Sequence, residues 1–201
     1  MPNPNHESRV LLPESNPPRR GFLGLTSRAT LSAAALMLVG GHEALAQGMS
    51  GTSSDISILN TALGLEYEAI GAYQLGAQSG LLQKPVLQVA VYFQGQHKAH
   101  RDALIATIHK LGGMPVADKS LDEYATELQA NTLKSQADVL ALATRLELGA
   151  ANAYIGVIPS FKDPQLAKIS GRIAADEVSH YTALLGAQGL PLPANALSFG
   201  A

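Results

Sequence analysis

Apolar residues recur with the 3.6-residue period of an α-helix in four segments of the chain. Cap residues, prolines and glycines bound these segments, which cover 51–80, 85–113, 135–159 and 163–189. Each segment contains roughly 25 residues, which is about 37 Å of helix. No segment alternates polar and apolar residues in the way a half-buried strand does. The pattern therefore predicts an all-α fold with four long helices.

The lengths of the connections predict how the helices pair. Only a few residues separate the first segment from the second and the third from the fourth, which forces two antiparallel hairpins. The link from Met114 to about Lys134 is long enough to run the length of a bundle. It contains a capping box, Ser120-x-x-Glu123, which predicts a short helix. The sequence thus predicts a four-helix bundle made of two hairpins joined by one long crossover.

Residues of metal-ligand type interrupt the apolar stripes, and the second half of the chain repeats the first. The matching positions are Glu66 and Tyr73 with Glu147 and Tyr154, and His97 and His100 with Glu177 and His180. Matching residues are 81 positions apart in the Glu and Tyr set and 80 apart in the other set. Because residues spaced three or seven apart share one face of a helix, all of these side chains are expected to face the bundle axis.

Several ionised carboxylates buried together need a cation between them, because an unpaired buried charge is too costly to keep. The candidate metal ligands are Glu66, His97, His100, Glu147, Glu177 and His180. The chain has no cysteine, which excludes disulfides, iron–sulfur clusters and thiolate zinc sites. Carboxylates and imidazoles without sulfur suit iron or manganese ions, one or two per chain, and tolerate zinc.

With these motifs the chain resembles the ferritin-like superfamily of carboxylate-bridged di-metal proteins over roughly residues 54–189. Rubrerythrin, bacterioferritin and manganese catalase share the scheme of a Glu on one helix and Glu-x-x-His on the next, then both again. The chain is most similar to exported bacterial ferritin-like domain proteins. The resemblance implies a ferritin-like four-helix bundle and assigns ligand roles to five residues, namely Glu66, His100, Glu147, Glu177 and His180.

His97 departs from the family's pattern, because it occupies the place of the first bridging Glu. Four carboxylates would neutralise two divalent ions, whereas three leave an excess charge of +1. We interpret His97 as a ligand that cannot bridge, which makes a histidine-rich mononuclear site or a loosely coupled pair of ions plausible. Gln94, three residues before His97, could add a neutral ligand, but its counterpart in the repeat is Ala174.

The remaining residues of interest have simpler interpretations. Tyr73 and Tyr154 are core residues that could hydrogen-bond a ligand or an intermediate. Glu68, Asp102 and Asp176 are expected on solvated faces. The glycines expected to allow close approach of helices are Gly71, Gly149 and Gly156.

The first 46 residues are typical of a secretory signal peptide. The pair Arg19-Arg20 precedes an apolar stretch of small residues from Leu31 to Gly40, and Ala44-Leu45-Ala46 provides a cleavage site. The Arg pair resembles the bacterial twin-arginine signal, which implies export of a folded protein to the periplasm or beyond. The apolar run is shorter than the about 20 residues that span a bilayer. Residues 47–201 are therefore expected to form the bundle, with a short irregular tail from Leu190 and no membrane span after cleavage.

Composition and motifs leave three classes of function open. The formal net charge is −2 and no basic patch indicates nucleic acid. The first class is a redox enzyme of catalase, peroxidase or ferroxidase type, acting on oxygen or peroxide. The second is a metal-binding protein of the cell envelope without turnover, and the third is a structural or stress-related protein with a degenerate metal site. Assembly into a homo-oligomer is compatible with all three.

Overall fold

The computed structural model describes residues 51–200, and these residues confirm the all-α prediction. The long helices are α3 (Gly51–Gln78), α4 (Lys84–Lys110), α6 (Gln136–Gly156) and α7 (Pro164–Ala187). The shorter ones are α5 (Leu121–Glu127) and the 3₁₀ turns η1 (Ala130–Thr132) and η2 (Ile158–Ser160). No strand occurs between residues 51 and 200. The predicted signal peptide, residues 1–46, lies outside the described residues.

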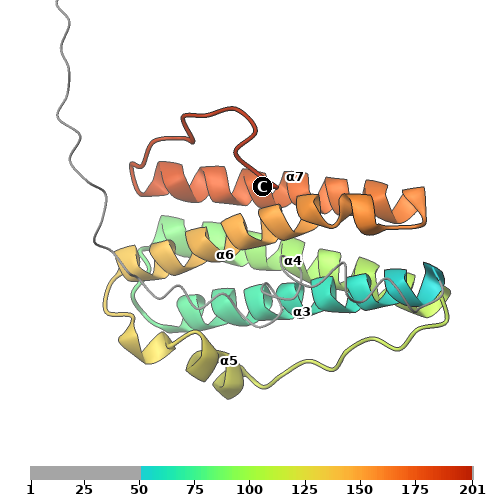
Figure 1. The fold of residues 1–201 in the computed structure, drawn as a ribbon. Coiled ribbons are helices and arrows are strands. Elements are labelled where there is room, and N and C mark those ends of the chain that lie inside the picture. Colours follow the sequence, from blue (N-terminus) through green and yellow to red (C-terminus); the bar gives the residue numbers. More distant parts are fainter. Residues whose placement is uncertain (1–50, 201) are drawn as a thin grey trace, which may run out of the picture. The chain divides into compact units, whose positions relative to one another are not determined.

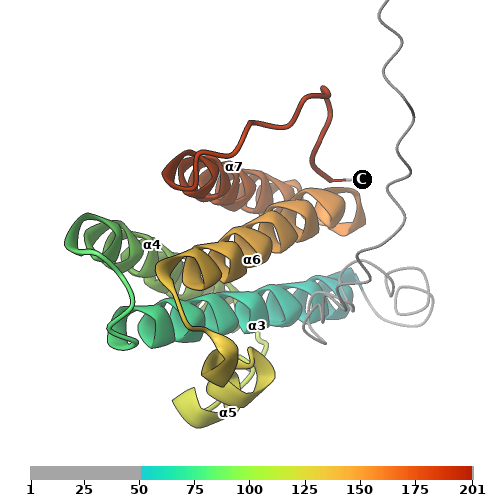
Figure 2. The same ribbon diagram turned by 90° about the vertical axis from the view of Figure 1, so that its left-hand side faces the viewer.

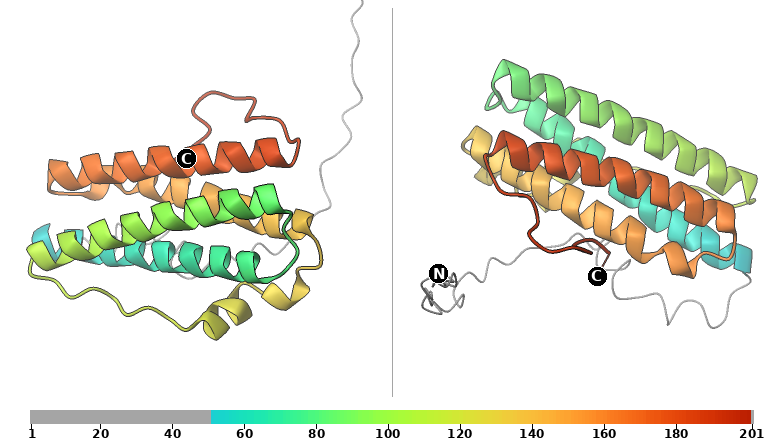
Figure 3. Two further views of the ribbon diagram at one scale, coloured as in Figure 1. Left: turned by 180° about the vertical axis from the view of Figure 1, so that it is seen from behind. Right: turned by 90° about the horizontal axis from the view of Figure 1, so that it is seen from above.

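The helices pair as two antiparallel hairpins. The most extensive contacts are those of α3 with α4 and of α6 with α7, and the hairpins meet through α3 with α6 and α4 with α7 (Figures 1 and 3). The crossover from 111 to 135 runs back along α3 and carries α5, which packs against α3 (Figure 2). This is the ferritin-like arrangement of a four-helix bundle, and it places the middle of all four helices around one axis.

The predicted caps start three of the helices. The Ser135 side chain accepts a hydrogen bond from Asp138 N, and Asp163 accepts one from Gln165 N. The capping box of Ser120 and Glu123 forms at the start of α5. Because each cap satisfies backbone N–H groups that lack an intrahelical acceptor, these starts could be predicted from local sequence.

The candidate cap residues 51–55 behave differently, since they lie within α3. Asp55 is buried, and its carboxylate accepts hydrogen bonds from the backbone N–H groups of Lys162 and Asp163. It therefore ties α3 to the connection between α6 and α7, which a local pattern cannot reveal.

The crossover also explains why one sequence prediction was wrong. Glu68, expected on a solvated face, is only 7% exposed. It lies one turn before Gly71 on α3, and Gly71 packs against the ring of Tyr124 from α5. The face of α3 that points away from the bundle axis is thus covered by the crossover rather than by water.

Gly71 is required for this contact, and Gly149 provides a matched control on α6. A Cβ added at Gly71 would lie 2.7 Å from Cδ2 of Tyr124, whereas one added at Gly149 meets nothing within 4 Å. We expect Gly71→Ala to destabilise the protein by about 1–3 kcal/mol through overpacking. Gly149→Ala should instead stabilise it by up to about 1 kcal/mol, through higher helix propensity. Urea unfolding of both variants checks this, and an equal gain in both would contradict the close contact. Gly149 and Gly156 therefore do not mediate the expected close approach.

The chain after α7 is irregular, as predicted, and is held by few contacts. It turns back along α7 (Figure 1), and Gly200 N donates a hydrogen bond of 2.8 Å to the Asn152 side chain on α6. The ring of Phe199 contacts that of Tyr181 edge-on, with centroids 5.8 Å apart. None of the described helices is long and apolar enough to cross a membrane.

Candidate metal centre

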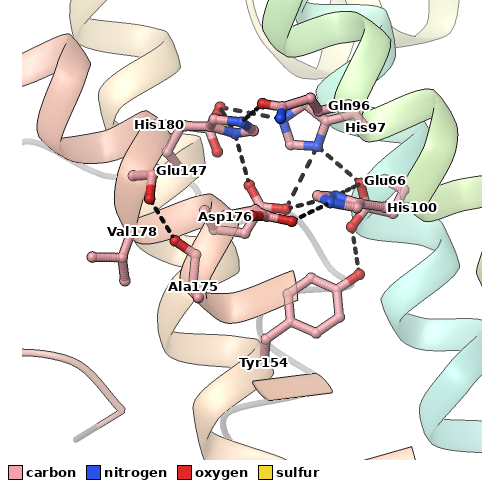
Figure 4. Close-up of polar contacts among 12 residues, drawn as sticks. Glu66, Gln96, His97, His100, Glu147, Tyr154, Ala175, Asp176, Val178 and His180 are labelled. Carbon is pink, nitrogen blue, oxygen red and sulfur yellow. Dashed lines mark hydrogen bonds and ion pairs between the residues drawn. The ribbon is translucent and has the colours of Figure 1, made fainter. Parts of the chain in front are cut away.

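All six predicted ligands meet at the centre of the bundle. Glu66 comes from α3, His97 and His100 from α4, Glu147 from α6, and Glu177 and His180 from α7. Figure 4 shows the three imidazoles and the carboxylates converging from these helices. His100 is 9% exposed and the other five are at most 2% exposed. Because all lie on apolar stripes, the burial follows from helical periodicity.

Their ligand atoms form two overlapping groups. The first contains Glu66, His97, His100 and Glu177, and the second contains His97, Glu147, Glu177 and His180. Within each group, one ligand atom per residue lies within 4.8 Å of the others. His97 and Glu177 belong to both groups and therefore stand between two potential metal positions.

Glu177 presents a different oxygen to each group. Its Oε1 lies 3.2 Å from Nδ1 of His100, and its Oε2 lies 3.2 Å from Nδ1 of His180. A carboxylate placed in this way can bridge two cations. Glu177 would thus be placed to bridge two ions, which is consistent with the ligand role that the family resemblance implies.

His97 likewise presents one ring nitrogen to each group. Its Nδ1 lies 2.8 Å from Oε2 of Glu66, and its Nε2 lies 3.2 Å from Oε1 of Glu147. A neutral imidazole keeps a hydrogen on one nitrogen, so it can ligate only one ion at a time. His97 therefore borders both positions without replacing the second carboxylate bridge.

Two residues to which the sequence analysis gave no role in the site orient the other imidazoles. His180 Nε2 donates a hydrogen bond of 2.6 Å to Oε1 of Gln96, and His100 Nε2 donates one of 3.1 Å to Oδ2 of Asp176. These bonds leave Nδ1 of both rings facing the carboxylates, which is how a neighbouring acceptor fixes the tautomer of a metal-binding histidine. Asp176, expected to be solvated, is 51% exposed but makes this contact.

A signal for both residues was present in the repeat. Gln96 and Asp176 are 80 positions apart, and each lies four residues before a histidine of its own helix. Each nevertheless bonds to the histidine of the other helix, which only the packing of α4 against α7 determines. Gln94, considered as a neutral ligand, instead donates to the Ile70 carbonyl and to the Gln74 side chain.

The two tyrosines cross between α3 and α6 in a reciprocal way. The hydroxyl of Tyr73 donates to Glu147, and the hydroxyl of Tyr154 donates to Glu66. Burial and the adjacent carboxylate raise the pKa of both phenols well above its ordinary value. Both tyrosines therefore remain hydroxyl donors at neutral pH, and they hold the carboxylates of the opposite helix in position.

Buried opposite charges shift the pKa values of the carboxylates. Burial alone would raise the pKa of Glu66, but His100 and His97 lower it to about 2. Burial also opposes ionisation of Glu147, yet its contacts with His180 and His97 lower its pKa. For Glu177 burial dominates, and its pKa is raised despite His100 and His180.

The pKa values of the imidazoles shift upwards, which favours their charged form. Burial would lower the pKa of His100, but Glu177 and Glu66 raise it to about 10. The carboxylates likewise overcome burial and raise the pKa values of His97 and His180. The carboxylates therefore favour protonation of the imidazoles when no metal is bound.

These shifts predict how the stability of the metal-free protein depends on pH. His100 has a raised folded pKa, so its contribution is complete below about 6.5 and is lost as pH rises towards about 10. Glu66 has a lowered pKa, so its contribution is complete above 4.5 and is lost as pH falls towards about 2. We expect maximal stability between about pH 4.5 and 6.5, and a loss of roughly 2–5 kcal/mol by pH 10, at about 1.4 kcal/mol per pKa unit.

Urea unfolding in the presence of a chelator, at pH 5.5 and pH 9.5, measures this dependence. Metal binding requires deprotonated imidazoles, so stabilisation by added metal should grow over the same range in which the metal-free protein weakens. His100→Gln should reduce the loss of unfolding free energy between pH 5.5 and pH 9.5. A metal-free protein that is more stable at pH 9.5 would contradict the ion pairing.

The donor atoms of the site fit a bound cation. Nδ1 of His100, Oε2 of Glu147 and Oε1 of Glu177 are buried and make no well-aligned hydrogen bond, and the first and third of these atoms contact each other only as an ion pair of 3.2 Å. All three belong to the two overlapping groups, and an unsatisfied buried polar atom is costly. A metal ion would satisfy all three, and oxygen and nitrogen donors without sulfur suit iron or manganese.

The fold and the site together define a four-helix bundle with a buried carboxylate and imidazole centre on its axis. The chain belongs to the ferritin-like domain family, whose model matches residues 54–189. A comparison with curated proteins gives no match.

Two solved structures share the fold. A conserved hypothetical protein from Mycobacterium tuberculosis is 23% identical with a TM-score of 0.58, over 73% of this chain and 99% of that one. A dodecameric thioferritin, the bacterioferritin-related protein from Bacteroides fragilis, is 21% identical with a TM-score of 0.58, over 69% of this chain and 86% of that one. At this level of identity the two structures establish the fold alone.

Proposed function

We propose that this protein is an exported ferritin-like metal protein whose centre reacts with oxygen or peroxide. The proposed ligands are Glu66, His97, His100, Glu147, Glu177 and His180, with Tyr73 and Tyr154 positioning the carboxylates. The observation that carries the proposal is the pair of four-residue groups sharing His97 and Glu177. A bound iron or manganese ion would supply a change of oxidation state and a coordination position for the oxidant.

The chain's own residues prepare the site in three ways. Gln96 and Asp176 orient two imidazoles from outside the ligand set. The tyrosine hydroxyls restrain Glu66 and Glu147 by donating hydrogen bonds to their carboxylate oxygens. Burial of all the proposed ligands excludes bulk water, which strengthens electrostatic interactions within the site.

A second candidate function is a structural or stress-related envelope protein that operates without metal. His97 favours it, because its two nitrogens already contact Glu66 and Glu147, and its pKa is raised. Protonated imidazoles could then neutralise the carboxylates in place of metal. The three buried ligand atoms without a well-aligned hydrogen bond, above all Oε2 of Glu147, favour the metal-binding alternative.

Export and assembly are further parts of the proposal. Residues 1–46, with Arg19 and Arg20, support export through the twin-arginine pathway. Replacing both arginines with lysine should retain the protein in the cytoplasm, which fractionation of cells would detect. The dodecameric assembly of the thioferritin relative supports a homo-oligomer, and sedimentation would measure its size.

Metal content is the deciding measurement. Elemental mass spectrometry of the protein purified from its export compartment should find one or two iron or manganese ions per chain. Oxidation of the bound metal by oxygen and by peroxide would then be followed spectroscopically. If no metal is present and none is taken up from Fe²⁺ or Mn²⁺ solutions, the structural alternative holds.

A further inference from the structure

One end of the bundle interior is hollow, and the cavity reaches the metal centre. Its volume is about 230 Å³, and it lies between the C-terminal halves of α3 and α7 and the N-terminal halves of α4 and α6. Its walls are alanine, glycine, valine, leucine and proline, and the only polar residues among them are Tyr73 and Glu147. Both belong to the candidate metal centre, and they are 7% and 2% exposed.

The internal repeat provides a control for this cavity within the same molecule. The equivalent space at the other end of the bundle lies beside Tyr154, the counterpart of Tyr73, and holds a cavity of only about 10 Å³. Counterparts line the two spaces, such as Leu140 and Leu59, 81 positions apart, or Leu184 and Leu104, 80 apart. The same helix arrangement is therefore filled at one end and open at the other.

Side-chain volume accounts for the difference. Gly76 in the open end corresponds to Val157 in the filled end, and Val86 corresponds to Leu166. Phe161 closes the filled end, and the position 81 residues earlier is Gly80, which ends the first hairpin helix with a positive φ of 71°. The side chains of one of two equivalent layers are thus smaller than those of the other, although an empty cavity destabilises a protein.

The cavity opens between α4 and α7. Val89, on the apolar stripe of α4, is 43% exposed, and Pro85 and Ala187 on the same rim are also exposed. The inner end is closed by the buried side chains of Tyr73 and Glu147. A molecule entering at Val89 would therefore cross an apolar passage and meet polar atoms only at the metal centre.

We propose that this cavity binds an uncharged apolar small molecule, with the chemistry of a medium-length alkyl chain, whose inner end lies at Glu147. An apolar cavity of about 150 Å³ in another protein holds benzene and excludes water, so about 230 Å³ accommodates a larger hydrocarbon. Apolar pockets with a few convergent polar groups are the usual form of small-molecule sites. Because Glu147 and the Tyr73 hydroxyl form the inner wall, and an anion would be repelled by the carboxylate, the inner end of the ligand carries a hydroxyl or no polar group.

Calorimetric titration of the purified chain with 1-octanol, in the presence of a chelator, tests the site without requiring bound metal. Ala143→Leu on α6 fills the cavity, whereas Ala141→Leu adds the same atoms at an exposed position two residues away. We expect 1-octanol to bind the wild type and the Ala141→Leu protein equally, and to bind the Ala143→Leu protein at least ten-fold more weakly. Should Ala143→Leu fail to fold, Ala90→Leu fills the cavity from α4, with the exposed Ala99→Leu as its control.

Three outcomes would overturn the proposal. If the wild type does not bind 1-octanol while Ala143→Leu raises the melting temperature, the cavity is a packing void. If binding is unchanged in Ala143→Leu and Ala90→Leu, the probe binds elsewhere. The third outcome is that the wild type self-associates and binds no probe, and that Val89→Lys makes it monomeric. In that case the rim is an interface with a second copy of this chain. None of these outcomes depends on metal content, so the proposed metal function succeeds or fails separately.

Discussion

Replacing Glu177 and His180 together with alanine should abolish metal binding and leave a helical, soluble bundle. The double variant removes one of the two residues shared by both ligand groups, and also one imidazole. Loss of a residue that merely orients a ligand costs about 10–100-fold in metal affinity, so loss of two ligands should exceed that. Circular dichroism should remain helical, because the helices are held by apolar layers that contain neither residue, such as Leu59, Leu104 and Ile173.

Elemental analysis after dialysis against Fe²⁺ or Mn²⁺ measures this result. The double variant Glu127→Ala with His109→Ala removes the same two residue types at exposed positions and serves as the matched control. The control should bind as much metal as the wild type. Unchanged metal content in Glu177→Ala with His180→Ala would refute the site assignment.

His97→Glu should have the second large effect, because it restores the carboxylate that the family's scheme has at this position. Four carboxylates neutralise two divalent ions, whereas the three present in this chain do not. We expect the number of bound ions to rise to two per chain and the affinity for the second ion to increase at least ten-fold, about 1.4 kcal/mol. Without metal, the variant should be less stable than the wild type by roughly 3–5 kcal/mol. The reason is that a buried imidazole, which can be protonated, is replaced by a carboxylate whose charge nothing compensates.

Thermal unfolding with excess Mn²⁺ and with a chelator separates these two effects. His97→Gln is the control, since it removes the imidazole without adding charge. The metal-dependent gain in melting temperature should be largest for His97→Glu and smallest for His97→Gln. If the wild type, His97→Glu and His97→Gln bind equal amounts of metal and gain equally in melting temperature, His97 does not border the metal positions.

The four helices and the six candidate ligands could be predicted from sequence for the same physical reason. A helix repeats every 3.6 residues, so a residue such as Glu147 in an apolar stripe faces the bundle axis wherever the helix packs. The repeat strengthened the assignment, because two residues such as Glu66 and Glu147 occupy equivalent places in two hairpins. Caps such as Ser135 and Asp163 act within one turn and were therefore predicted from local residues.

Other features of the site depend on contacts between helices and could not be predicted. Asp176 looked like a surface residue from its own helix, yet it bonds to His100 of α4. Gln96 repeats as Asp176, but nothing on its own helix shows that it orients His180 of α7. Glu68 is buried because the crossover covers its face of α3, which depends on the path of a connection rather than on periodicity.

The sequence by itself determined the class of fold, the antiparallel hairpins and which carboxylates and imidazoles face the bundle axis, because each follows from helix periodicity and connection length. Only the tertiary structure decided which nitrogen of His97 faces which group, and that Tyr73 and Tyr154 cross to the carboxylates of the opposite helix. It also decided that one end of the bundle is hollow and the other filled. Such features depend on how side-chain volumes and hydrogen-bonding groups from several helices combine in space, and no single helix encodes that combination.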